Sequence, residues 1–220
     1  IMNNSTVKTP WLQHYGHIPH TLDYPDISMV DLVERTAQRF PEHIAYEFMG
    51  NKATYAKLMA EVGACATALK AIGVQKGEKV TICLPNVPQA VIMLYAVNRI
   101  GALCNMIHPL SSEGEIAHFI NFSESRVVIT LDQFYPKFKA IQGEIALDTL
   151  IIASVKEALP SLTKIGYALT KGRKIAKVPA SDMAARGGKV FLWNDFLAYG
   201  KGYRDRLAGS LRRHYQAAHR

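Results

Sequence analysis

The residues best suited to chemistry lie in one short loop, His108-Pro-Leu-Ser-Ser112. It offers the imidazole of His108 and the hydroxyl groups of Ser111 and Ser112, and Ser112 with Glu115 has the spacing of a capping box that begins a helix. A helix N-terminus suits phosphate and other anions because its free N–H groups point at the ligand. We therefore take His108, Ser111 and Ser112 as candidate anion-binding residues. In the alternative, the serines only cap the helix and His108 is an ordinary loop residue.

Several other kinds of site are excluded by the sequence. It contains no G-x-x-x-x-G-K-[ST] phosphate loop, no G-x-G-x-x-G after a strand and no G-x-S-x-G elbow. The eight histidines never pair with cysteine or carboxylate at metal-ligand spacing, and no two carboxylates are placed for acid–base work. The three cysteines are scattered, which is typical of buried thiols in a reducing compartment. We therefore assign no catalytic and no metal-ligating residue.

The elements that must position the loop are four short apolar runs, Lys79–Cys83, Ala102–Ile107, Arg126–Thr130 and Thr149–Ala153. Their starts lie 23 or 24 residues apart, which fits a strand, a helix and two short loops in each unit. Strands that are apolar on both faces and alternate with helices predict an α/β fold, with a mostly parallel sheet and helices on both faces. Ligands bind such sheets where loops leave the carboxyl ends of strands, here residues 84–88 and 108–112.

Helical and turn signals fill the rest of residues 28–155. A helix capped by Ser28 is expected to end at Pro41, with its apolar face made by Met29, Leu32, Val33, Thr36, Ala37 and Phe40. A hairpin begins with the strand at residues 44–48. It leads to a second helix, in which Leu58, Val62, Cys65, Leu69 and Ile72 recur at steps of four and three. Asn86 is expected to cap a third helix, which has Pro88 in its first turn.

The chain divides into four predicted parts. Residues 1–27 are an irregular arm that Trp11 and Tyr15 could anchor on the body, and residues 28–155 are the α/β core. Residues 156–189 are a basic excursion, and residues 190–220 hold an aromatic docking strand and a basic tail.

The net charge of +8 is unevenly distributed. Residues 156–177 and 201–220 each carry six basic residues against one acidic residue, so the rest of the chain is close to neutral. A basic face for nucleic acid is therefore not expected on the α/β body. The stripe of Leu162, Ile165 and Leu169 has basic flanks, so it could lie on an anionic membrane, or it could be a solvated loop.

No stretch of about eighteen apolar residues is present, and the first twenty residues have no apolar segment typical of a secretion signal. We therefore expect a cytoplasmic protein, and the sequence leaves peripheral membrane contact open.

An ordered set of motifs in residues 28–155 resembles the N-terminal part of the adenylate-forming acyl-CoA synthetases, the AMP-dependent synthetases and ligases. The segments that carry the resemblance are Val33-Glu-Arg-Thr-Ala-Gln-Arg-Phe-Pro41, Thr54-Tyr-Ala-Lys-Leu58, Leu69-Lys-Ala-Ile-Gly-Val-Gln-Lys-Gly-Glu-Lys-Val80, Leu84-Pro-Asn86, Arg99-Ile-Gly-Ala102 and Ser125-Arg-Val-Val-Ile-Thr130. The basic excursion followed by Trp193-Asn-Asp-Phe196 is similar to the fatty-acid-activating branch.

The resemblance implies a ligase that joins a carboxylic acid, a fatty acid in particular, to AMP with ATP and Mg²⁺ and then transfers the acyl group to coenzyme A. It also implies that the chain is the first part of such an enzyme. The family's phosphate-gripping signature, of the type T-S-G-T-T-G-x-P-K-G, and its later nucleotide motifs and catalytic lysine have no match here. We therefore expect the chain alone to be inactive, to hold no tightly bound cofactor and to partner the missing C-terminal part.

The candidate loop departs from the family pattern. Many relatives have Asn-Pro where this chain has His108-Pro109, and in some the corresponding loop lies near bound coenzyme A. The resemblance thus implies a coenzyme A role for His108, Ser111 and Ser112. A rival interpretation is a non-catalytic α/β module that binds anionic lipid or nucleic acid through its basic C-terminal third.

Overall fold

The computed structural model describes residues 9–160, 163–164, 166, 177–184 and 187–204. Its helices are η1 (Pro10–His14), α1 (Met29–Arg39), α2 (Tyr55–Ala71), α3 (Pro88–Arg99), α4 (Glu113–Ser123), η2 (Asp132–Phe134), α5 (Tyr135–Ala140), η3 (Val155–Ala158), η5 (Ala180–Asp182) and a helix over residues 193–204. Its strands are β1 (Ile44–Phe48), β2 (Asn51–Thr54), β3 (Lys79–Cys83), β4 (Leu103–Met106), β5 (Val127–Leu131), β6 (Thr149–Ala153) and β7 (Val190–Leu192).

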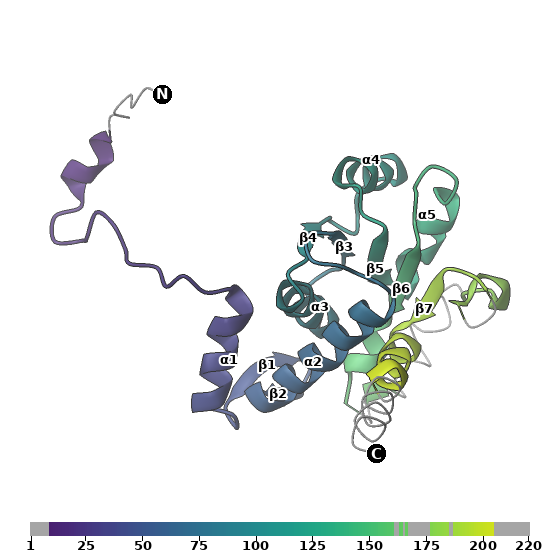
Figure 1. The fold of residues 1–220 in the computed structure, drawn as a ribbon, viewed down its shortest axis with the longest axis horizontal. Helices are drawn as coiled ribbons and strands as arrows, with labels where there is room; N and C mark the ends of the chain where they lie inside the picture. The colour runs from purple at the N-terminus through teal and green to yellow at the C-terminus, as the bar shows by residue number, and fades with distance from the viewer. Residues whose placement is uncertain (1–8, 161–162, 165, 167–176, 185–186, 205–220) are drawn as a thin grey trace, which may run out of the picture.

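Five parallel strands form the central sheet, in the order β4-β3-β5-β6-β7 (Figure 1). The four predicted runs coincide with β3, β4, β5 and β6, so the predicted α/β fold is confirmed. From β3 the chain crosses to β4 on one side and then to β5 on the other side. The strand order therefore reverses between β3 and β5, and the crevice outside their carboxyl ends is where open α/β sheets bind ligands.

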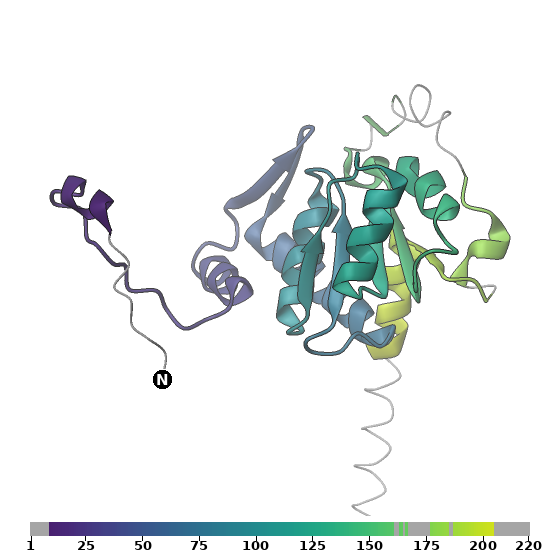
Figure 2. The same ribbon diagram turned by 90° about the horizontal axis from the view of Figure 1, so that it is seen from above.

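Helices cover both faces of the sheet, as expected for buried parallel strands (Figures 1 and 2). On one face α2, α3 and the helix over residues 193–204 pack on the sheet, and on the other face α4 and α5 do so. β1 and β2 pair with each other in a separate antiparallel hairpin, apart from the central sheet.

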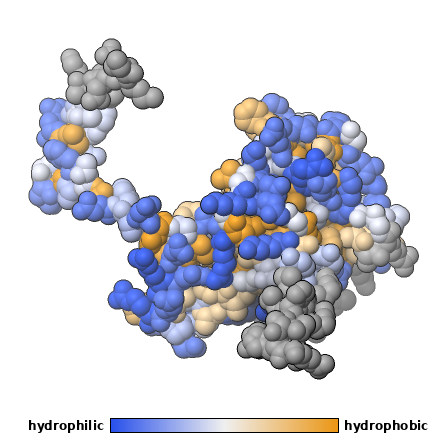
Figure 3. All heavy atoms as spheres, in the orientation of Figure 1, coloured by the Kyte–Doolittle hydropathy of each residue, from blue (hydrophilic) through white to orange (hydrophobic). Residues whose placement is uncertain are grey.

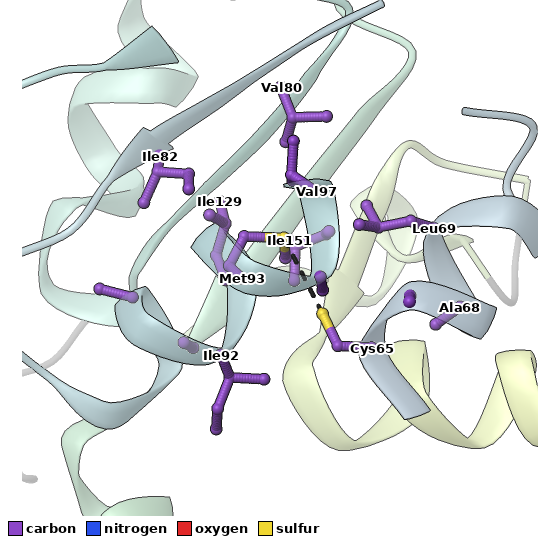
Figure 4. Close-up of a cluster of buried hydrophobic side chains, with 14 of the residues drawn as sticks. Cys65, Ala68, Leu69, Val80, Ile82, Ile92, Met93, Val97, Ile129 and Ile151 are labelled. Carbon is purple, nitrogen blue, oxygen red and sulfur yellow. Dashed lines mark hydrogen bonds between the residues drawn. The ribbon is translucent and has the colours of Figure 1, made fainter. Parts of the chain in front are cut away.

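The larger core lies between α2, α3 and the sheet (Figure 4). Cys65 of α2 meets Met93 of α3, with a distance of 3.9 Å between the two sulfur atoms, above Ile129 of the sheet. The predicted apolar face of α2 is buried here, except that Ile72 is half-buried. Gly73, with φ +96°, follows the helix in a left-handed conformation that suits glycine.

The predicted apolar face of α1 is confirmed only in part. Ser28 caps the helix as expected, Ala37 is buried and Val33 packs against the core. Met29, Leu32 and Phe40 are exposed instead, and Val30, which was not predicted, is buried. The reason is tertiary: Asn98 Oδ1 of α3 accepts a hydrogen bond of 3.0 Å from the Val30 N–H. This contact sets the rotation of α1 against α2 and α3, so only a narrow stripe is covered.

Two smaller expectations also fail. The arm extends away from the body (Figure 1), and Trp11, a predicted anchor, is 51% exposed. The N-cap of α3 is Val87 rather than Asn86, and no side chain caps that helix, because valine has no polar side-chain atom to accept the free N–H groups.

At the other end of the described chain, β7 joins the sheet beside β6, and Trp193 and Phe196 are buried in the larger core. The sequence predicts a docking strand followed by a basic tail, but a helix occupies residues 193–204. It packs closely on α2, because a Cβ atom at Gly200 would lie only 2.6 Å from Ala68 Cα. Residues 205–220 of the predicted tail lie outside the described part.

Candidate functional site at the carboxyl edge of the sheet

The loop that contains His108, Ser111 and Ser112 follows β4 and enters α4, at the carboxyl edge of the sheet. The Ser111 N–H donates to His108 O at 3.1 Å, and the Leu110 N–H donates to His108 Nδ1 at 3.2 Å. These bonds fold the loop into a compact turn. The structure therefore places the three predicted residues together.

Ser112 is engaged by its own helix. Its Oγ accepts a hydrogen bond of 3.3 Å from the Glu115 N–H, and its N–H donates to Glu115 Oε2 at 2.8 Å. The Ser112 hydroxyl also donates to Glu115 Oε2 at 3.0 Å, and the bonds that the Ser112 N–H and hydroxyl donate to this carboxylate hold the pKa of Glu115 below its usual value. A carboxylate of the protein thus already occupies the N-terminus of α4 and disfavours an anion directly on it. Capping explains Ser112, but His108 and Ser111 are not explained in this way.

Lys137 of α5 brings a positive charge to this loop. Its Nζ donates a hydrogen bond of 2.6 Å to Ser111 O, and it lies over the ring of Phe134 at 5.9 Å. The exposed imidazole of His108 and the ammonium of Lys137 are groups that could contact a phosphate. Lys137 could not be found from sequence patterns, because its contact with Ser111 depends on how α5 packs beside α4.

A second polar cluster lies at the carboxyl ends of β5 and β6, beside the point of strand reversal. Gln89 Nε2, in the first turn of α3, donates to Ser154 O at 3.1 Å, and the Ser154 N–H donates to Glu157 Oε2 at 3.0 Å. Burial raises the pKa of Glu157, and the nearby charge of Asp132 raises it further. Gln89 Oε1 and Ser154 Oγ are buried and have no hydrogen-bond partner within the described residues.

The cluster suits a hydroxyl group, an amine or water, because Gln89 Oε1 accepts a hydrogen bond and Ser154 Oγ can donate or accept one. An anion is disfavoured by the carboxylates of Asp132 and Glu157. The sequence analysis missed this cluster. Asp132 and Ser154 each follow a strand directly and could have been found, whereas Gln89 is brought to Ser154 only by the fold.

The strand ends themselves are joined by Thr130, whose Oγ1 donates a hydrogen bond of 3.1 Å to Cys83 O. Burial raises the pKa of the Cys83 thiol to about 11 and that of Cys104 to about 11. Cys65 and Cys83 are buried as expected, and Cys104 is half-buried. Because the thiolate is the nucleophile, thiols with raised pKa values do not serve as nucleophiles near neutral pH.

Across the described ranges, no group of three or more His, Cys, Asp or Glu side chains could hold a metal ion. The same ranges contain no helix that is long and apolar enough to cross a membrane. Most of the predicted membrane-contacting segment, including Leu162, Ile165 and Leu169, lies outside the described residues. The lipid or nucleic-acid alternative depends on that segment and on residues 205–220, so it stays a prediction.

The fold and its edge loops define the class of protein, an α/β domain with an open parallel sheet and polar loops at the carboxyl ends of its strands. Residues 33–185 match the AMP-binding enzyme family, and the chain belongs to this family. It is 35% identical over 167 residues to a long-chain-fatty-acid–CoA ligase of Bacillus subtilis (strain 168), a match that covers 76% of this chain and 30% of that protein.

Other relatives agree. An acetyl-coenzyme A synthetase of Pyrobaculum arsenaticum is 33% identical over 150 residues, covering 68% of this chain and 21% of that protein. A solved structure of a long-chain-fatty-acid–CoA ligase from Archaeoglobus fulgidus matches with a TM-score of 0.57 at 26% identity, covering 63% of this chain and 30% of that one. A coronafacic acid ligase from Pectobacterium brasiliense, at 16% identity and a TM-score of 0.62 over 78% of this chain and 29% of that one, shares the fold. The chain thus spans about a third or less of these proteins.

Proposed function

We propose that this chain is the N-terminal part of an AMP-forming ligase that activates a fatty acid with ATP and transfers the acyl group to coenzyme A. The observation that carries the proposal is the 35% identity to the Bacillus subtilis ligase over 167 residues. The family match covers residues 33–185, which run from within α1 through β6. ATP, Mg²⁺ and coenzyme A are the cofactors of the proposed whole enzyme. The proposed acid is a fatty acid, because the Bacillus subtilis relative is named a long-chain-fatty-acid–CoA ligase.

In this proposal the chain supplies a frame and one binding loop. Bound ATP would supply the activation of the carboxylate, and no phosphate-gripping signature for it occurs in these 220 residues. The described residues also lack a carboxylate cluster suited to Mg²⁺. We therefore expect the chain alone to be inactive, since the preorganised donors that stabilise a transferring phosphoryl group are missing.

The loop after β4 fits a phosphate of coenzyme A in part. His108 and Ser111 lie in one compact turn, and Lys137 Nζ donates a hydrogen bond of 2.6 Å to Ser111 O in that turn. The side chains of His108, Ser111 and Lys137 would bind and orient a phosphate oxygen. Ser112 would act on the loop only through its bonds to Glu115. The proposed roles are therefore contact for His108, Ser111 and Lys137, and positioning for Ser112.

The first experiment measures acyl-CoA formation by the purified chain with ATP, Mg²⁺, palmitate and coenzyme A, and the Bacillus subtilis ligase serves as the active control. We expect no product above the enzyme-free rate. Acyl-CoA formation by the chain alone would refute its inactivity.

The second experiment titrates coenzyme A into the isotope-labelled chain and follows amide signals by NMR. We expect shifts at His108, Ser111 and neighbouring residues, which Lys137→Gln weakens at least threefold in affinity. Lys139→Gln is the matched control, because Lys139 lies on the same helix but pairs with Asp182. Shifts confined to other regions, or equal loss in both variants, would count against the loop.

A further inference from the structure

A cavity of about 190 Å³ lies between α5 and the segment that leads into β7. Phe138 of α5 and Ile145 of the loop that follows it form one apolar wall. Leu150 and Val190, the first pair in the ladder between β6 and β7, form another, and all four residues are buried. The cavity is therefore near the amino ends of these two strands, whereas the candidate loop lies at the carboxyl edge of the sheet.

The segment before β7 closes the cavity and is fixed to α5, beside which it lies (Figures 1 and 2). Asp182 accepts a hydrogen bond of 2.8 Å from Lys139 Nζ and another from the hydroxyl group of Tyr135, and both donors belong to α5. Gly188 packs on the same residue, because a Cβ atom there would lie only 2.2 Å from Asp182 O, and its N–H donates to Met183 O at 3.0 Å. The cavity is thus largely preformed, as small-molecule sites usually are.

A cation is disfavoured in this cavity. Asp182 provides the one carboxylate among the described residues that line it. The hydrogen bonds from Lys139 and Tyr135 hold the pKa of Asp182 below its usual value, so this carboxylate is ionised near neutral pH and has its positive partner within the chain. A cationic ligand would instead meet two ammonium groups, those of Lys139 and Lys189.

Lys189 brings an unbalanced positive charge to the mouth of the cavity. Its Nζ donates a hydrogen bond of 2.5 Å to Leu147 O and has two further N–H groups to offer. In the part of the chain that the structure describes, no carboxylate pairs with Lys189, and the nearby Asp148 accepts bonds of 2.5 and 2.7 Å from Arg126. Because an ammonium group bonds a carboxylate more strongly than a neutral acceptor, Lys189 favours an anionic group at the mouth.

The volume of the cavity limits the body of its ligand. An apolar cavity of about 150 Å³ holds benzene, so a volume of about 190 Å³ suits an apolar body of roughly six to eight heavy atoms. A long-chain fatty acid is too large for it. Figure 3 shows a mainly hydrophilic surface around α5, so the apolar walls are not part of an exposed apolar patch on this face.

We propose that this cavity binds a small monocarboxylic acid, with its apolar body between Phe138, Ile145 and Leu150 and its carboxylate bonded to Lys189 Nζ. Asp182, held by Lys139 and Tyr135, positions the wall that closes over the body. The proposal goes beyond the proposed function, because the ligand is too small to be a long-chain acid and the cavity lies away from the candidate loop.

Titration of phenylacetate into the isotope-labelled 220-residue chain tests the site by NMR. The methyl signals of Ile145, Leu150 and Val190 should shift and saturate with a Kd below about 10 mM. Phenylacetamide, which has the same shape without the charge, should bind at least about threefold more weakly, and benzylamine more weakly still.

Three outcomes of this titration would overturn the proposal. They are the lack of any saturating shift at these methyl groups, equal affinity for phenylacetate and phenylacetamide, and shifts centred on His108 and Ser111 in place of the cavity. The measurement needs neither ATP nor coenzyme A, so its failure would leave the ligase function untouched.

Lys189→Gln isolates the charge. The variant keeps a hydrogen-bond donor, so we expect it to weaken phenylacetate at least about threefold and to leave phenylacetamide unchanged. Lys76→Gln, the matched change at an exposed lysine in the turn before β3, should alter neither affinity. An equal loss for both ligands in Lys189→Gln, or no loss for phenylacetate, would contradict the assigned contact.

Leu147→Trp tests the cavity itself. Leu147 lines the cavity and is half-buried, so a larger side chain there would fill the space and should abolish binding of both ligands. The melting temperature of the variant shows whether it folds, and Lys189→Gln decides the proposal if it does not. Unchanged affinity in a folded Leu147→Trp variant would show that the acid binds elsewhere.

Discussion

At the scale of single residues, the cluster of Gln89, Ser154 and Glu157 combines satisfied and unsatisfied polar atoms. Glu157 accepts from the Ser154 N–H, while Gln89 Oε1 and Ser154 Oγ lack partners among the described residues. Buried polar groups without partners cost free energy, so such a cluster is tolerated where another molecule, water included, completes it. The bond between Ser154 and Glu157 caps η3 in the same way as the bond between Ser112 and Glu115 caps α4, so the unpartnered atoms are what set this cluster apart.

Glu157→Gln tests the cluster by stability. The pKa of Glu157 is higher in the folded chain than in the unfolded chain. Glu157 therefore contributes to the free energy of unfolding below its unfolded-state pKa, where it is protonated in both states. This contribution is lost as the pH rises through its folded-state pKa. The amide keeps an acceptor for Ser154 and adds donors near Gln89. We expect the variant to gain up to about 1 kcal/mol in free energy of unfolding at pH 7, and less at pH 4.

Chemical denaturation at pH 4, 5.5 and 7 measures this difference. Glu42→Gln, at an exposed position, should leave the free energy of unfolding unchanged at each pH. A loss of stability at pH 7 in Glu157→Gln, or the same profile in both variants, would show that the cluster does not act through burial of Glu157.

At the scale of elements, sequence patterns predicted the strands of the sheet and the helices that pack directly on it. The steps of four and three in α2 and the apolar runs of β3, β5 and β6 were confirmed, because burial against a broad face leaves one arrangement. The face of α1 was right at Val33 and Ala37 but wrong at Met29, Leu32 and Phe40, and Val30, which bonds to Asn98, was missed. Trp193 and Phe196 dock on the body as predicted, but the helix over residues 193–204 that carries them was missed, and its close approach to Ala68 depends on glycine at position 200.

Gly200→Ala tests that docking. Alanine favours a helix over glycine by about 1 kcal/mol, but the new Cβ atom would lie 2.6 Å from Ala68 Cα and 2.7 Å from Ala68 Cβ. We expect a net loss of about 1–3 kcal/mol in free energy of unfolding, as for overpacked cores.

Gly114→Ala, the matched change in α4, meets nothing within 4 Å and should be neutral or stabilising by up to about 1 kcal/mol. Urea denaturation of both variants gives the comparison. If both changes stabilise, the helix does not press on Ala68.

At the scale of the whole molecule, two cores share one sheet, so we expect the described body to unfold as one unit. The carboxyl edge as a candidate site was predictable, because it follows from topology alone. Lys137 and Gln89 were not predictable, because each reaches the edge through packing between elements far apart in sequence. The division into four parts stays a prediction.

Removal of residues 1–27 tests the first boundary. None of the described residues of the arm before Ile27 is buried, and the hydrogen bonds of these residues, such as that from the Ile18 N–H to Tyr15 O, stay within the arm. We expect the shortened chain to unfold within about 0.5 kcal/mol of the full chain.

Ser28→Ala shows that the measurement is sensitive to α1. It removes the cap of that helix, whose Oγ accepts from the Asp31 N–H at 3.2 Å, and should cost about 1 kcal/mol. A loss from arm removal as large as that from Ser28→Ala would place the arm within the folded body.

The position of β7 has a consequence for the order of folding. β3, β4, β5 and β6 follow one another through short connections, whereas β7 reaches β6 only after residues 154–189. Closing a longer loop delays pairing but changes the free energy slowly, by about 0.6 kcal/mol for each doubling of length. We therefore expect β7 and its helix to dock in a late, separate kinetic phase. Inserting ten glycine and serine residues into the connection should slow that phase while leaving equilibrium stability nearly unchanged.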